Sequence, residues 1–117
     1  MKVLVVHQSE AVVADIKAHW GQWIIHTVPS GLDGLMTCRS QVFDLILCGL
    51  DLPVVTGIEM IRSIRNISEN RETPVLFLAE GKETEEHFRI VNKMNARLLT
   101  LDQIKETDFQ KGAKVTT

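Results

Sequence analysis

Five short apolar runs, rich in leucine and β-branched residues, are the feature that most limits how this chain can fold. Each run is continuous instead of alternating, which is typical of a strand with helices on both faces of its sheet. Segments with helical spacing of apolar residues separate the runs. Such alternation favours a right-handed, doubly wound parallel sheet. We therefore predict an α/β fold of three layers around a five-stranded sheet, with strands at Val3–Val6, Trp23–Val28, Asp44–Cys48, Val75–Leu78 and Arg97–Leu101.

Two of the segments between strands begin with helix-capping patterns. Ser30–Asp33 has the S-x-x-D form of a helix start. We expect the helix behind it to turn Leu32, Leu35 and Met36 toward the sheet. Thr56–Glu59 matches a full capping box before a strongly amphipathic segment, so this is the clearest helix in the chain.

The last two helices are expected to differ in strength. A cluster of glutamates marks the start of the first of them, and Phe88, Val91 and Met94 recur at the spacing of an inward stripe. The final segment, 102–111, is polar and only weakly patterned. If its helix is short, apolar surface on the preceding helix and strand is left partly uncovered, which favours a partner there.

Length and composition predict one domain that does not bind through bulk charge. The chain has 117 residues, and we assign 1–111 to the domain and expect 112–117 to be a disordered tail. A net charge of −2 does not indicate the positively charged surface that binds nucleic acid. We find neither an apolar stretch of the roughly 18 residues that cross a bilayer nor a signal-peptide pattern. The expectation is a cytoplasmic protein without membrane contact.

Four motifs together point to a family. They are the stretches Asp44–Pro53, Gly57–Arg65, Pro74–Ala79 and Met94–Leu99. In apolar pattern, loop prolines and spacing, the chain from Met1 to Ile104 resembles the receiver domains of bacterial response regulators of the chemotaxis type. The resemblance implies a flavodoxin-like fold and a role in signal transduction.

The resemblance also implies a phosphorylation pocket, and this chain departs from it at every position. Receivers carry two acidic residues after the first strand, where this chain has His7 and Gln8. Gly49 stands at the position of the aspartate that accepts phosphate. Ala79 replaces the hydroxyl residue after the fourth strand, and Leu101 replaces the lysine after the fifth. The intervals of 30 and 22 residues between these last three positions match the family's spacing.

These departures remove the chemistry of an aspartyl phosphate. A carboxylate nucleophile and carboxylate-held Mg²⁺ are both required, and Gly49 has no side chain. Asp51 is the nearest carboxylate, and we interpret it as a loop-capping residue. We therefore expect a degenerate pocket with no catalytic residue, no metal and no cofactor, and a protein that is not an enzyme.

Two other interpretations stay open. A phosphorelay receiver could still be modified at a non-standard acceptor. From a different class, His7, Cys48 and Asp51 could form a small metal or redox site, because imidazole, thiolate and carboxylate are all metal ligands. Neither Cys38 nor Cys48 lies in a C-x-x-C pair, which weakens the redox interpretation.

The surface that receivers use for signalling is also changed. Leu98 stands where the resemblance places an aromatic that changes rotamer on the fifth strand. Phe88 and Val91 lie on the neighbouring fourth helix. We predict a fixed conformation that binds a protein partner, or a second copy of the chain, through the fourth helix, fifth strand and fifth helix.

Overall fold

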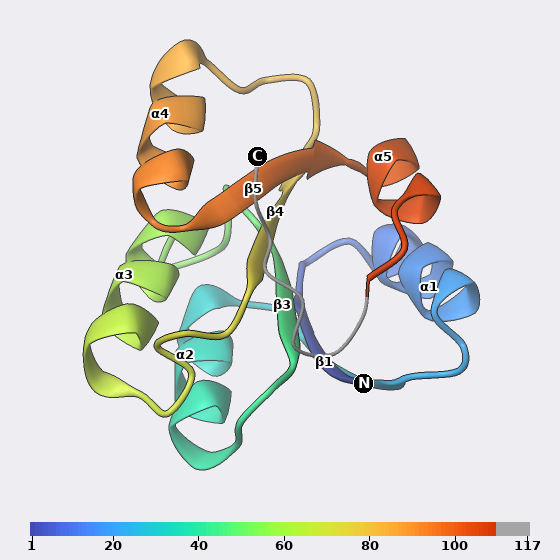
Figure 1. Cartoon of the computed structure of the whole chain (residues 1–117), viewed down its shortest axis with the longest axis horizontal. Coiled ribbons are helices and arrows are strands. Elements are labelled where there is room, and N and C mark those ends of the chain that lie inside the picture. Colours follow the sequence, from blue (N-terminus) through green and yellow to red (C-terminus); the bar gives the residue numbers. More distant parts are fainter. Residues whose placement is uncertain (110–117) are drawn as a thin grey trace.

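A computed structural model describes residues 1–109 and contains one parallel sheet between two layers of helices (Figure 1). The five strands lie in the order β2-β1-β3-β4-β5 and are β1 (Lys2–Val6), β2 (Ile24–Val28), β3 (Leu45–Gly49), β4 (Val75–Ala79) and β5 (Ala96–Thr100). The predicted fold class is confirmed. The expected domain end at 111 and the tail 112–117 lie outside the described residues.

Helices cover both faces of the sheet, as the continuous apolar runs require. Figure 1 shows α1 and α5 on one face and α2, α3 and α4 on the other. Successive strand residues point to opposite faces, so Val3 and Val5 pack toward α1 while Leu4 and Val6 pack toward α2 and α3. The helices are α1 (Glu10–His19), α2 (Gly31–Ser40), α3 (Gly57–Ile67), α4 (Glu85–Lys93) and α5 (Leu101–Glu106).

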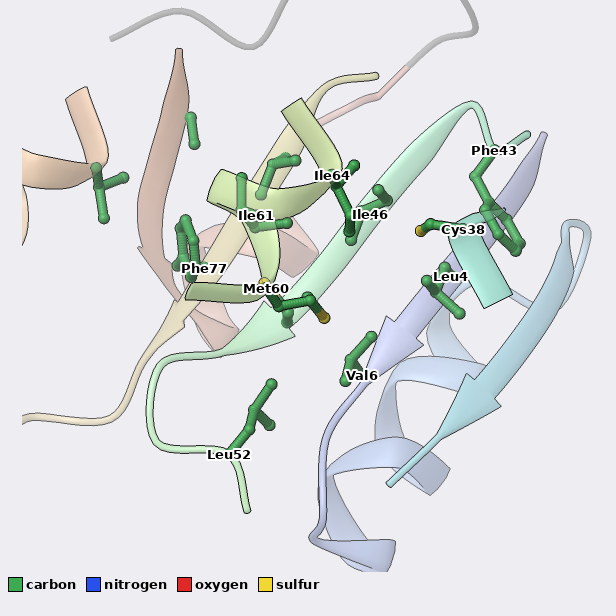
Figure 2. Close-up of a cluster of buried hydrophobic side chains, with 14 of the residues drawn as sticks. Leu4, Val6, Cys38, Phe43, Ile46, Leu52, Met60, Ile61, Ile64 and Phe77 are labelled. Atoms are coloured by element: carbon green, nitrogen blue, oxygen red, sulfur yellow. The ribbon is translucent and has the colours of Figure 1, made fainter. Parts of the chain in front are cut away.

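Helix α3 forms as its sequence predicts. Both hydrogen bonds of the capping box are present, between the backbone and side chains of Thr56 and Glu59. Met60, Ile61 and Ile64 are fully buried against the sheet (Figure 2). Truncating one such side chain to alanine costs about 2–5 kcal/mol, so this contact is a main source of stability.

Helix α2 packs through its glycines, and the predicted inward face was wrong at Leu32 and Met36. Both are exposed, the latter at 58%, whereas Leu35 is partly buried and packs against the core. A side chain at Gly34 would collide with the Met60 sulfur and with a neighbouring strand residue. Because the glycine side brings α2 closer to the sheet than a leucine side could, the large residues turn outward.

The amino edge of the sheet is closed by a buried asparagine. Asn70 is 0% exposed. Its amide oxygen accepts from the Phe43 N–H at 2.8 Å, and its amide nitrogen donates to the carbonyls of Cys38 and Gln41 at 2.9 and 2.7 Å. Thr73 adds a hydroxyl hydrogen bond to the same amide oxygen. Through these bonds, the segment before β4 holds the end of α2 and the chain leading into β3 together.

The last strand and helix begin one residue earlier than predicted. β5 ends at Thr100, whose hydroxyl accepts from the Gln103 N–H as the cap of α5. Leu101 is therefore the first residue of a helix and not the end of a strand. That helix ends at Glu106 instead of reaching 111, so the short alternative is the observed one.

Candidate functional site

The carboxyl ends of β1, β3 and β4 meet at one edge of the sheet. Strand order reverses between β1 and β3, and ligand sites of doubly wound sheets form at such a switch point. A cavity of about 480 Å³ lies here. Its polar lining residues are His7, Gln8, Asp51, Thr56, Glu80, Lys82, Glu83 and His87, and its apolar ones include Leu52, Ile58 and Leu78.

His7 is held in one orientation at the centre of this edge. Its side chain is 10% exposed, although it directly follows β1. Nδ1 accepts a hydrogen bond from the Ser9 N–H at 3.0 Å, which places the proton of a neutral ring on Nε2. Nε2 lies 2.6 Å from Oε1 of Glu80 and donates to it. A charge-assisted hydrogen bond thus joins the end of β1 to the segment after β4.

Gly49, the buried last residue of β3, leaves the space that the His7 ring uses. A Cβ at position 49 would lie 3.3 Å from Cδ2 of His7 and 3.4 Å from Cδ2 of Leu52. The first distance is tighter than ordinary van der Waals contact, and a longer side chain would project further toward the ring. The glycine and the imidazole therefore fit each other.

The loop between β3 and α3 is strained. Val54 has a φ of 67°, a left-handed conformation that is a genuine outlier for a β-branched residue. The Val55 N–H donates to the Pro53 carbonyl at 2.7 Å, which closes a γ-turn around Val54. At the end of the loop, a side chain on Gly57 would overlap the carbonyl of Gly49. The loop is consequently pressed against the end of β3.

The segment between β4 and α4 caps itself. The Glu83 carboxylate accepts hydrogen bonds from the N–H groups of Glu80 and Gly81 at 2.9 and 3.0 Å. Burial alone would raise the pKa of Glu83, but these backbone bonds outweigh it and lower the pKa. Next along the chain, the Thr84 N–H donates to Nδ1 of His87 at 3.1 Å. The segment is thus ordered by local bonds.

The structure brings some of the predicted pocket residues together and separates others. Gln8 and Asp51 line the cavity beside His7 and Gly49, with exposed side chains. Ala79 does not line it, because Leu78 faces the cavity and successive strand residues point to opposite sides.

Leu101 does not line this cavity either. As the first residue of α5 it packs against the core cluster beneath α1 and α5, which includes Ile16 and Leu99. The prediction that the fifth strand ends at Leu101 was wrong, since β5 ends at Thr100. The Thr100 cap explains this, since it starts the helix at that point.

The alternative metal or redox set is not assembled. Cys48 packs in the core cluster between the sheet and α3, and Nε2 of His7 is bonded to Glu80. Burial raises the pKa of Cys48, and it raises the pKa of Cys38 to about 12, so both thiols stay protonated at neutral pH. Within residues 1–109, no three His, Cys, Asp or Glu side chains are grouped to hold a metal ion.

A second hollow, which we call the α4–β5 groove, lies beside the cavity and has a volume of about 440 Å³. Val91 is buried beneath it, as predicted, and Leu98 lies on its floor strand. Phe88 was expected to face inward but is half exposed at its rim. The groove is lined by Ala79, Phe88, Val91, Asn92, Arg97, Leu98, Leu99, Thr100 and Gln103.

Glu80, Glu83 and His87 were missed by sequence reasoning. A signal for Glu80 was available, because a doubly wound order places β1 and β4 on either side of β3. A histidine and a glutamate directly after those two strands must then flank Gly49. The inward turn of the His7 ring had no such signal, since it depends on the Ser9 N–H.

Solved structures with this fold are numerous, and three illustrate the range. The chemotaxis response regulator CheY4 of Vibrio cholerae is 24% identical, with a TM-score of 0.76 over 86% of this chain and 85% of that one. The receiver domain of sensor histidine kinase PA1611 from Pseudomonas aeruginosa, with magnesium in its active site cleft, is 23% identical, with a TM-score of 0.74 over 90% and 93%. The Mn²⁺-bound response regulator Rcp1 is 19% identical, with a TM-score of 0.76 over 90% and 86%.

Similarity to these structures supports the fold alone, and the family follows from the sequence match. No curated protein sequence matches the chain. No helix within residues 1–109 is long and apolar enough to span a membrane. The model of the response regulator receiver domain matches residues 3–110. The chain therefore belongs to the response regulator receiver domain family, whose members act in two-component signalling.

Proposed function

We propose that this receiver domain carries no phosphoryl group and works as a protein-binding module in bacterial signal transduction, in the cytoplasm and without enzymatic activity. One observation carries the proposal. The His7 ring lies against Gly49 and is bonded to Glu80, at the place where a phosphoacceptor side chain would project. A phosphoryl group attached there would have to displace that ring.

The residues around this point supply little of what phosphoryl transfer needs. Gly49 offers no nucleophile. His7 is a poor substitute, because its Nδ1 accepts a backbone hydrogen bond and its Nε2 carries the proton. Mg²⁺ prefers several oxygen ligands in octahedral geometry, and Glu80 is already committed to His7.

The alternative interpretation is a receiver that is modified at a non-standard acceptor, and Asp51 is the candidate acceptor. It lines the cavity with an exposed side chain, so a phosphodonor could reach it. Against this, the nearby groups include Glu80 and Glu83, whose negative charges oppose an incoming phosphate. Lys82 is the one cation among the cavity's lining residues in the described part of the chain.

The α4–β5 groove is the surface that we propose for a partner. It is largely apolar, and its rim residue Phe88 is half exposed. Helix α5 lies on the other face of the sheet from α4 and contributes one lining residue, Gln103, to the groove. Exposed aromatic side chains beside an apolar hollow are typical anchors of protein interfaces. The occupant is a partner protein or a second copy of the chain.

Intact-mass spectrometry tests the absence of phosphorylation. The protein is incubated with acetyl phosphate and Mg²⁺, beside a receiver domain that has an aspartate at the phosphoacceptor position. We expect no mass increase in this chain and a clear increase in the control receiver. A mass increase of one phosphoryl group that is absent in Asp51→Asn would refute the proposal and support modification at a non-standard acceptor.

Sedimentation over a range of concentrations tests the groove. Self-association that is lost in Phe88→Ser but kept in Met36→Ser, which changes another exposed apolar residue on α2, would identify a homodimer through this face. A strict monomer excludes the homodimer. The remaining expectation is a partner protein that binds wild type and Met36→Ser but not Phe88→Ser.

A further inference from the structure

The cavity and the α4–β5 groove share the segment that connects β4 to α4. Ala79 lines the groove, and the next residue, Glu80, lines the cavity. At the far end of the segment, His87 lines the cavity and the next residue, Phe88, lines the groove. Because a peptide bond joins each pair, any shift of this segment changes both hollows together.

One side-chain hydrogen bond ties this segment to another strand. Within residues 1–109, the other side-chain bonds of 80–84 are local and involve Glu83 and His87. The bond from His7 to Glu80 is the one that reaches β1. Gly81 follows at a φ of 92°, which gives the backbone a pivot next to the bonded residue. The position of the segment therefore depends on this bond.

The two ends of the bond differ in freedom. His7 is the fixed end, since its side chain is 10% exposed, contacts the Gly49 position and accepts from the Ser9 N–H. Glu80 is the free end, because its side chain is 52% exposed and no other bond of that side chain is found in the described residues. Loss of the bond would release the segment and leave β1 in place.

We propose that the His7–Glu80 hydrogen bond is a latch that holds the β4–α4 segment against β1 and thereby sets the shape of the α4–β5 groove. When the latch is closed, Ala79 and Phe88 are held in the positions that shape the groove. When it opens, the segment moves and the groove changes. That the change alters partner binding rests on the function proposed above, but the link between the two hollows does not.

Three variants of the full chain test the latch, without Mg²⁺ or any phosphodonor. Glu80→Ala removes the acceptor. Glu80→Gln keeps an amide oxygen at the same place and serves as the rescue. Glu85→Ala removes a neighbouring exposed carboxylate that lines neither hollow, and serves as the matched control. Amide hydrogen exchange of residues 80–84 and NMR signals of the Ala79 and Leu98 methyl groups and the Phe88 ring are the readouts.

We expect exchange to rise about tenfold or more in Glu80→Ala, because the acceptor is lost. It should rise less in Glu80→Gln, which keeps an uncharged acceptor, and change less than about twofold in Glu85→Ala. The groove signals should shift most in Glu80→Ala and not at all in Glu85→Ala. Unchanged groove signals in a folded Glu80→Ala protein would overturn the latch, and so would equal shifts in Glu85→Ala. Neither result touches the proposal that the domain is not phosphorylated, which the acetyl phosphate experiment decides separately.

Discussion

The two edges of the sheet are built in opposite ways. At the amino edge, Asn70 is 0% exposed, and its side chain makes hydrogen bonds to Phe43, Cys38 and Gln41, which belong to α2 and the chain leading into β3. At the carboxyl edge, a cavity of about 480 Å³ remains. One exposed carboxylate, Glu80, connects its two sides.

This difference assigns separate tasks to the two edges. Arg65 reinforces the amino edge, because its Nη1 donates to the carbonyls of Asn70, Arg71 and Thr73 at 3.3, 3.0 and 2.6 Å. Asn70 is buried with both of its side-chain polar atoms hydrogen-bonded, and a polar group of this kind specifies one packing and resists local opening. We infer that the amino edge stabilises the fold and that the carboxyl edge is left adjustable for binding.

Asn70→Ala should give the largest effect, at the amino edge. The substitution leaves the Phe43 N–H and two carbonyls buried without their partner, so we expect a loss of about 3 kcal/mol or more in the free energy of unfolding. Urea denaturation measures it, with the exposed Asn66→Ala as control. A loss below about 1 kcal/mol would mean that the two edges are not as different as we claim.

Gly49→Asp should have the next largest effect, at the carboxyl edge. The new carboxylate would press on the His7 ring in a buried place, at a cost of about 2 kcal/mol. In a His7→Ala background the same substitution should cost clearly less, because the ring is gone. Equal costs in the two backgrounds would show that the ring does not fill this space. We also expect no phosphorylation of Gly49→Asp by acetyl phosphate.

Val54→Gly should stabilise the protein by about 1 kcal/mol, because glycine has no Cβ and adopts the positive φ that valine resists. Val42→Gly is the matched control, since Val42 is also exposed but has an ordinary φ. Thermal unfolding of both variants is the measurement. If both variants become more stable, or neither does, the Val54 backbone is not strained.

Glu59→Gln should give the smallest effect, and only in acid. Hydrogen bonds from the Thr56 backbone and side chain lower the pKa of Glu59 below its usual 4.5. The ionised carboxylate therefore stabilises the fold above about pH 4.5, and this contribution is lost as the pH falls through the lower folded value. Melting temperatures between about pH 3 and 6 should depend less on pH in Glu59→Gln than in wild type. Glu86→Gln, which removes an exposed carboxylate from α4, should keep the wild-type dependence.

The sequence predicted a helix correctly where its pattern of caps and apolar residues matches the way in which the helix packs. Helix α3 shows this, because its capping box and its buried Ile61 and Ile64 are all visible in the sequence. In α2 the same rules failed for Leu32 and Met36, since periodicity does not reveal that a helix will approach through its glycines. The buried Asn70 was also hidden, because its partners are distant in sequence.

The candidate site was predictable in place but not in detail. The strand ends located His7, Gly49 and Asp51 at one edge. The same reasoning misplaced Leu101, because the cap at Thr100 starts α5 one residue earlier than the apolar run suggests. To predict the bond between His7 and Glu80, one must know the strand order and the direction of the His7 ring. The sequence pattern indicates the strand order but not the direction of the ring.

The most direct test of the central claim is an NMR titration of the full chain with Mg²⁺ and then beryllofluoride, a mimic of the phosphoryl group. With the His7 ring in place at Gly49, we predict no saturable change in the amide signals of Gly49, Leu50 and Glu80 at millimolar Mg²⁺. We predict none after beryllofluoride either. Saturable shifts at these amides that require both reagents would contradict the account.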